Sequence, residues 1–219
     1  MKRTNWTGLA AALCMALTPE AGSALVISEL FYDAVGVDDG LSFVELYGAP
    51  GTSLDGLVVE GINGANGAVT HSLVLSGAVP DDGIFVLADG VDGGASFVPD
   101  ADLVLDFDFQ NGPDSVALRS GEVVLDALGY GVFAPGDVFA GLGTPAPDVP
   151  AGASLARRFA NVNSGDNFAD FIALDVPTPG SAPLVGVPEP GTALLVAAGL
   201  AGFARSGARR RRMHPARSH

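Results

Sequence analysis

Four aspartates form the densest group of potential metal ligands in this sequence: Asp100, Asp102, Asp106 and Asp108. Carboxylate oxygens are the ligands that calcium prefers in proteins, so this series is a candidate calcium site. Asp106 and Asp108 also alternate with apolar residues, which is typical of the solvent-facing side of a β-strand. No D-x-D-x-D-G calcium loop occurs in the chain. A calcium site and an exposed strand face therefore stay open as alternatives.

Residues for catalysis are scarce between the two chain ends. His71 is the one histidine between Leu25 and Val187, so a zinc or iron site rich in histidine cannot form there. A Ser-His-Asp triad could use His71, but no Gly-x-Ser-x-Gly turn is present. Gly141-Leu142-Gly143 lacks the third glycine and the helix of a dinucleotide-binding loop. We therefore expect a protein that is not an enzyme and that needs no cofactor, calcium excepted.

The central part of the chain is strongly acidic. Between Leu25 and Val187, three arginines and no lysine stand against 23 acidic residues, which gives a net charge of −20. The whole-chain value is only −14, because most of the basic residues lie near the two ends. An acidic surface repels phosphate backbones, so we expect no nucleic-acid partner.

Two carboxylates in apolar runs indicate a structural ion pair. Glu45 and Asp126 are flanked by apolar residues, where burying an unpaired carboxylate would be costly. Arg157 is one of the three central arginines, and a guanidinium can bind a carboxylate through two hydrogen bonds. The sequence predicts that Arg157 pairs with Glu45 or Asp126. Half-exposed carboxylates without a partner are the alternative, and in both cases these residues serve packing rather than catalysis.

The elements that must position these residues are short strands. Runs rich in Val, Ile, Leu and Phe alternate with turn dipeptides such as Asp39-Gly40 and Asn63-Gly64. The expected strands are Leu25–Tyr32, Ser42–Tyr47, Leu57–Gly61, Val69–Leu75, Ile84–Ala88, Leu103–Phe107, Ser115–Arg119 and Glu122–Leu128. A long loop should follow from Tyr130 to Ala153, then the last strands, then a linker from Asp175 to Val187. This pattern predicts an all-β domain of the β-sandwich class.

The N-terminus has the pattern of a secretory signal peptide. Lys2 and Arg3 precede an apolar run, and small residues follow up to Ala24. We therefore expect export through the secretion translocon and cleavage by signal peptidase after Ala24, with cleavage after Ser23 as the alternative. Cys14, the only cysteine in the chain, lies within this segment, so the exported part has no disulfide.

The C-terminus combines a proline motif, an apolar run and a basic cluster. The apolar run from Thr192 to Ala204 would form a short membrane helix, with the arginines on the cytoplasmic side. The motif and cluster residues are Val187, Pro188, Glu189, Pro190, Gly191, Arg209, Arg210, Arg211 and Arg212. In this order they resemble the PEP-CTERM signal of Gram-negative bacteria. The resemblance implies processing by an exosortase, transient residence in the inner membrane, and delivery to the cell surface or extracellular matrix.

The segment between the two ends resembles the lamin-tail domain family. The similar segments, in order, are Val26–Leu30, Ser42–Tyr47, Ser53–Leu57, Asn111–Leu118, Glu122–Tyr130, and Ser154–Arg157 with Ala169–Phe171 and Thr178–Gly180. Gly48 stands where the family usually has asparagine, and the asparagine that usually ends the family's last motif is missing after Pro183. The resemblance implies an immunoglobulin-like β-sandwich over residues 25–182. Residues 183–219 would form the linker, the sorting motif, the membrane helix and the basic tail.

These observations favour an exported, exosortase-sorted surface or matrix protein. Its β-sandwich would be a non-catalytic structural or binding module that contacts an envelope protein or polysaccharide. One alternative is a calcium-dependent adhesive module that uses surface carboxylates. Another is an accessory domain for a secreted hydrolase, as bacterial lamin-tail domains are often arranged.

Overall fold

The computed structural model describes residues 24–91 and 94–182. The predicted signal peptide and sorting tail lie outside these residues, except for Ala24. The described elements are β1 (Val26–Phe31), β2 (Phe43–Tyr47), β3 (Leu57–Asn63), β4 (Val69–Val74), β5 (Ile84–Asp89), β6 (Leu103–Leu105), β7 (Asp114–Ser120), β8 (Val123–Tyr130), β9 (Ser154–Arg157), α1 (Asn167–Asp170) and β10 (Phe171–Leu174).

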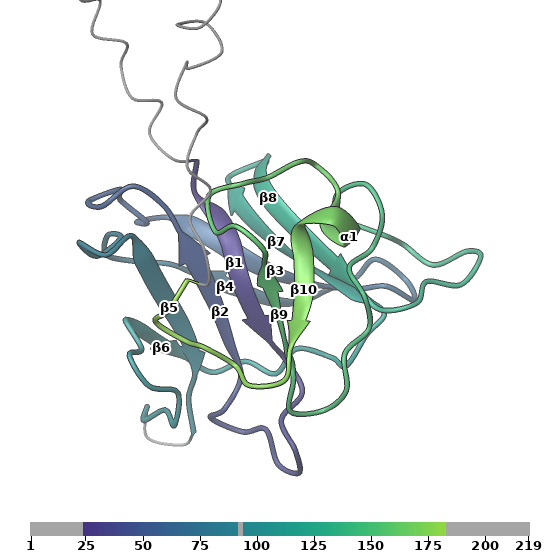
Figure 1. Ribbon diagram of the computed structural model, residues 1–219, viewed down its shortest axis with the longest axis horizontal. Coiled ribbons are helices and arrows are strands. Elements are labelled where there is room, and N and C mark those ends of the chain that lie inside the picture. The colour runs from purple at the N-terminus through teal and green to yellow at the C-terminus, as the bar shows by residue number, and fades with distance from the viewer. Residues whose placement is uncertain (1–23, 92–93, 183–219) are drawn as a thin grey trace, which may run out of the picture.

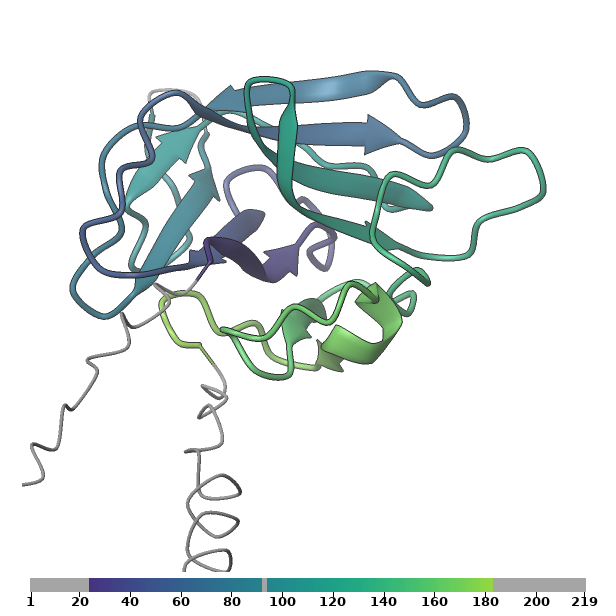
Figure 2. The ribbon, with the colours of Figure 1, turned by 90° about the horizontal axis from the view of Figure 1, so that it is seen from above.

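The strands form two sheets that lie in separate layers (Figures 1 and 2). The larger sheet has the order β10-β9-β1-β2-β5-β6, and the smaller has the order β4-β3-β7-β8. Neighbouring strands are antiparallel except β5 and β6, which are parallel. The first strand is therefore central in its sheet, between β2 and the late strand β9.

The main core lies between the two sheets. Leu30 and Val44 of the larger sheet and Leu118 and Leu128 of the smaller sheet belong to one buried apolar cluster. Strand alternation explains this packing, because every second side chain of a strand points to the same face. The central strand β7 reads Ser-Val-Ala-Leu over residues 115–118, and all four residues are buried.

The larger sheet also buries its outer face. Phe31, Phe43 and Val86 form a second apolar cluster on that side, against Val98 of the loop that leads to β6. Ala182 packs against the same cluster, so the chain returns across this face after β10. In Figure 1 the yellow-green segment after β10 crosses in front of β1 and β2. Covering both faces explains why every residue of β1 and β5 is buried.

The predicted all-β class is confirmed, with two sheets and a single helical turn in the described part. All eight predicted strands occur, and the last two follow the long loop as expected. β6 ends at Leu105 instead of Phe107, because the Phe107 N–H donates to the Asp89 side chain at 2.9 Å instead of continuing the ladder.

Two features of the C-terminal end differ from the sequence prediction or lie beyond it. The segment after Asp175 does not behave as a free linker, since residues up to Ala182 pack on the sheet. Within the described residues, no helix is long and apolar enough to span a membrane. The predicted membrane helix belongs to residues 183–219, outside that part.

Packing between the sheets makes a testable prediction. Leu118→Ala should lower the free energy of unfolding by about 2–5 kcal/mol, because the Leu118 side chain is fully buried. The matched change Val123→Ala on the neighbouring strand should stay within about 0.5 kcal/mol, since Val123 is 61% exposed. Urea melts of both variants measure the difference, and equal losses would contradict the described core.

Candidate functional site

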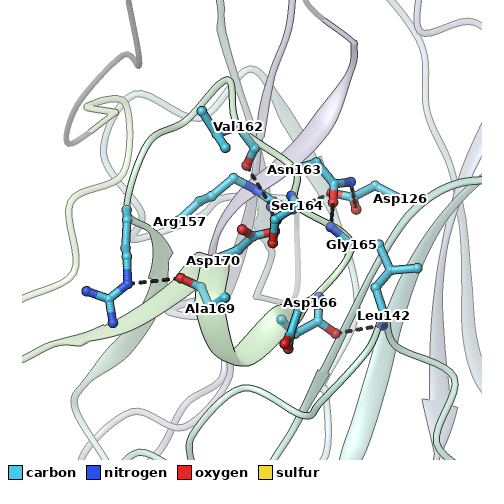
Figure 3. Close-up of polar contacts among 12 residues, drawn as sticks. Asp126, Leu142, Arg157, Val162, Asn163, Ser164, Gly165, Asp166, Ala169 and Asp170 are labelled. Carbon is cyan, nitrogen blue, oxygen red and sulfur yellow. Dashed lines mark hydrogen bonds and ion pairs between the residues drawn. The ribbon is translucent and has the colours of Figure 1, made fainter.

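Arg157 is the buried centre of a polar cluster (Figure 3). It ends β9 on the side that carries Leu155, which faces the core between the sheets. Its Nε donates to the Ile27 carbonyl at 2.9 Å, and its Nη1 donates to the Val162 carbonyl at 3.0 Å. The guanidinium carbon lies 4.5 Å from the centre of the Phe171 ring, a cation–π contact. The side chain is only 1% exposed, so these contacts replace its hydration.

Asp126 connects Arg157 to the smaller sheet. Its Oδ2 accepts from Arg157 Nη2 at 2.8 Å and from the Ile27 N–H at 2.8 Å. Its Oδ1 accepts from Asn163 Nδ2 and from the Ala127 N–H, both at 2.9 Å. Asp126 lies in β8 and Ile27 in β1, so this one carboxylate joins the two sheets.

Asp170 is the second carboxylate on Arg157. Its Oδ2 accepts from Arg157 Nη1 at 2.9 Å and from the Ser164 N–H at 2.9 Å. Asp170 ends α1, whose first turn is capped by Asp166 through a hydrogen bond to the Phe168 N–H. The cluster therefore also fixes the loop between β9 and α1.

The opposite charges of the cluster offset one another, which is typical of a structural ion-pair cluster. Burial raises the pKa of Asp126, and the Arg157 charge and the backbone N–H donors oppose that rise. Asp126 accepts from the guanidinium, from an asparagine amide and from backbone N–H groups, and Asp170 accepts from the guanidinium and from a backbone N–H group. This arrangement stabilises the fold.

Glu45 does not contact Arg157, which corrects the part of the predicted ion pair that included it. Its Oε1 accepts from Ser28 Oγ at 2.7 Å, and its Oε2 accepts from the Gly180 N–H at 3.0 Å. The reason is strand alternation. Glu45 shares the outer face of β2 with Phe43, whereas Arg157 faces the core between the sheets.

The four aspartates proposed for calcium do not converge on one centre. Asp102 precedes β6 and accepts from the Val86 N–H at 2.8 Å, while Asp106 and Asp108 follow the strand at its other end. Asp100 lies beside Gly180. Across the described residues, no group of three or more His, Cys, Asp or Glu side chains is arranged to hold a metal ion.

Asp106 and Asp108 instead line a small acidic cavity of about 100 Å³. The other carboxylates there are Asp38, Asp39 and Asp89. Asp89 is buried and engaged, since it accepts from the Gly40 N–H at 2.6 Å and from the Phe107 N–H. The alternation read in the sequence is therefore real, with Phe107 buried and its aspartate neighbours exposed, although β6 has already ended.

Sequence reasoning missed two buried polar residues, Asp170 and Asn167. Asn167 accepts from the Gly129 and Leu142 N–H groups at 2.9 and 2.8 Å and donates to the Ala127 carbonyl at 2.9 Å. The small number of arginines could have indicated Asp170. One buried arginine can bind two carboxylates, so a second acidic partner of Arg157 was to be expected. No sequence pattern marks Asn167, since its partners lie in β8 and in the long loop.

The proline motif and the basic cluster follow the described domain, outside its last residue, Ala182. Residues 186–212 match the PEP-CTERM protein-sorting motif. The match includes the predicted motif residues from Val187 to Gly191 and the arginines from Arg209 to Arg212. The PEP-CTERM signal makes the chain an exported protein that an exosortase sorts to the cell surface. Comparison with curated proteins and with solved structures finds no match to the chain.

The Arg157 cluster predicts a contrast between two neighbouring arginines. Arg157→Ala should lower the free energy of unfolding by about 3 kcal/mol, because it leaves Asp126 and Asp170 buried without their cation. Arg158→Ala should cost less than about 0.5 kcal/mol, since Arg158 is exposed, its Nε donates to the Ala169 carbonyl, and its backbone N–H bond to the Asp170 carbonyl survives the change. Denaturant melts measure both, and similar small losses would show that Arg157 is not the centre of the fold.

Proposed function

We propose that the β domain is a non-catalytic surface or matrix module of the lamin-tail type, which exosortase sorting delivers to the cell envelope. The observation that carries this proposal is the spacing of two parts of the chain. The described fold extends to Ala182, and the match to the sorting motif begins at residue 186. The sorting motif therefore acts on a chain whose adjoining folded part is this domain.

The contacts among residues of the lamin-tail-like motifs support the lamin-tail assignment. Asp126, Arg157 and Asp170 come from three separate segments of the resemblance, and the structure joins them in one cluster. Glu45 and Gly180 come from two further segments and are hydrogen-bonded to each other. If the chain shares the lamin-tail fold, residues of separate motifs should contact one another in the folded domain. The contacts described above agree with that expectation.

The same contacts support a module that binds rather than reacts. Its buried carboxylates accept hydrogen bonds from backbone N–H groups, hydroxyl groups and one arginine, so they serve the fold. The acidic surface favours partners that are neutral or basic, such as a neutral envelope polysaccharide or a basic protein. The proposed route runs through the secretion translocon, signal peptidase and the inner membrane of a Gram-negative cell.

The sorting signal predicts the mass of the mature protein. In a host with exosortase, the mature chain should lack the cluster from Arg209 to Arg212, and intact-mass analysis would detect the loss. In a host without exosortase, the same chain should keep its C-terminus through His219 and remain in the membrane fraction. A mature pool that ends at His219 in the exosortase host would contradict the sorting proposal.

The proposed role as a binding module predicts that the protein binds to components of the cell envelope. The mature protein should be retained by a glycan array or by envelope fractions of its host at physiological ionic strength, measured against Arg157→Ala as a destabilised control. Retention only with calcium would support the calcium-dependent adhesive alternative. No retention on either support would overturn the contact role and leave the sorting of the chain unaffected.

A further inference from the structure

Strand β4 presents a free backbone edge at one end of the smaller sheet. It pairs with β3 on one side and is the last strand of the sheet on the other. The Leu75 N–H donates to the Leu57 carbonyl at 2.8 Å, so alternate residues such as Leu73 direct their backbone groups toward β3. The backbone groups of Ser72 and Val74 therefore point away from the sheet. In the described part of the chain, no hydrogen bond outside the β3–β4 ladder uses them.

The β4 edge is uncharged, although the domain around it is strongly acidic. Residues 61–80, which include β4, form the longest stretch of the chain without Asp, Glu, Lys or Arg. Two carboxylates come close to this edge. Glu60 is paired with Arg119 at 3.5 Å. The Asp108 N–H donates to His71 Nε2 at 3.3 Å, on the face that packs against the core. A second acidic domain can therefore approach β4 with less repulsion than elsewhere.

The other strand edges of the two sheets are short, flanked by carboxylates or occupied. β6 has three residues and lies between Asp102 and Asp106, and β10 lies between Asp170 and Asp175. The edge of β8 is bonded by the side chain of Asn167. Short, charged or covered edges are the means by which natural sheets avoid pairing with other chains. Because β4 has six uncharged residues and none of these protections, it is the edge that favours pairing.

We propose that β4 pairs in the antiparallel direction with β4 of a second copy of this chain, which joins the two smaller sheets into one continuous sheet. A bonded antiparallel pair needs outward-pointing backbone groups on both strands. A twofold axis beside Ser72 meets this requirement, because it places Ser72 of the two copies opposite each other. Val74 of each copy then lies opposite Thr70 of the other, and the same uncharged residues face each other in both copies.

The size of the contact and the charge of the domain set the strength of this pair. Stable complexes bury more than about 1,000 Å², which one strand from each copy does not reach. The net charge of −20 between Leu25 and Val187 also makes two copies repel each other. We therefore expect pairing chiefly among copies that are held close together, and stronger pairing at raised salt, which screens the repulsion. The concentration of copies at an envelope rests on the proposed function above, whereas the strand pairing does not.

Disulfide cross-linking of the full chain in the membranes of a host without exosortase tests the pair. Every chain carries Cys14→Ala, so that the introduced cysteine is the only one. Facing residues of a bonded antiparallel pair have Cα atoms about 5.5 Å apart, which suits a disulfide. After oxidation with copper phenanthroline, Ser72→Cys should give on the order of tenfold more disulfide dimer than Val123→Cys. Val123 is the matched control, because it is 61% exposed on the opposite edge strand of the same sheet.

Two further measurements check the register and the edge. Chains with Thr70→Cys and chains with Val74→Cys should cross-link more when they are produced together than when each is produced alone. Adding Val74→Lys to the Ser72→Cys chain should lower the yield to the control level, because a lysine on an edge strand opposes pairing. Adding Val123→Lys should leave the yield unchanged, since it makes the same charge change at an equally exposed valine, 61% against 60%.

Equal yields from Ser72→Cys and Val123→Cys would overturn the pairing, as would a Ser72→Cys yield that Val74→Lys leaves unchanged. A disulfide that joins Ser72→Cys to a different host protein would show that the edge takes another partner, and it would also overturn the pairing of two copies. If Val74→Lys does not fold, the contrast between Ser72→Cys and Val123→Cys still decides. Cross-linking is measured in whichever cell fraction holds the chain, so its failure is distinct from failure of the sorting proposal.

Discussion

The fold depends on burying one guanidinium together with the groups that neutralise it. Arg157 binds two carboxylates and two backbone carbonyls, and through Asp126 it joins strands that belong to different sheets. Its partners lie far apart in the chain, since Ile27 and Arg157 are separated by 130 positions. The domain has no cysteine, so this polar cluster supplies a long-range cross-connection of the kind that disulfides give many exported domains.

Much of the fold could be predicted from the sequence, because strand formation follows local patterns of apolar and turn residues. The scarcity of cations reduced the candidates to three arginines, the lamin-tail resemblance favoured Arg157 among them, and Asp126 was correctly placed among its candidate partners. In the sequence, Glu45 and Asp126 were equally good candidates for the Arg157 partner. Which of them reaches Arg157 depends on the face of the sheet to which each side chain points, and the sequence alone does not give that face. Asp170 and Asn167 act through loops whose paths depend on tertiary contacts, so local patterns could not assign their partners.

The acidity of the domain has two different structural expressions. Outside, carboxylates such as Asp106 and Asp108 remain exposed to solvent around a small acidic cavity. Inside, carboxylates replace missing backbone partners, as Asp89 does for Gly40 and Phe107 and Asp126 does for Ile27. Such bonds let strands end, bend and pack at irregular positions, because a side chain accepts where a neighbouring strand does not.

The central position of β1 governs when the domain can be completed during export. β1 pairs with β2, which follows closely, and with β9, which lies more than 120 residues later. For a chain that crosses a membrane from its N-terminus, the early strands must wait with one edge of β1 unpaired until residues 154–174 have emerged. Only residues 175–185 separate these strands from the matched sorting motif, so the segments that complete the sheet and the segment that carries the sorting motif are close neighbours in the chain.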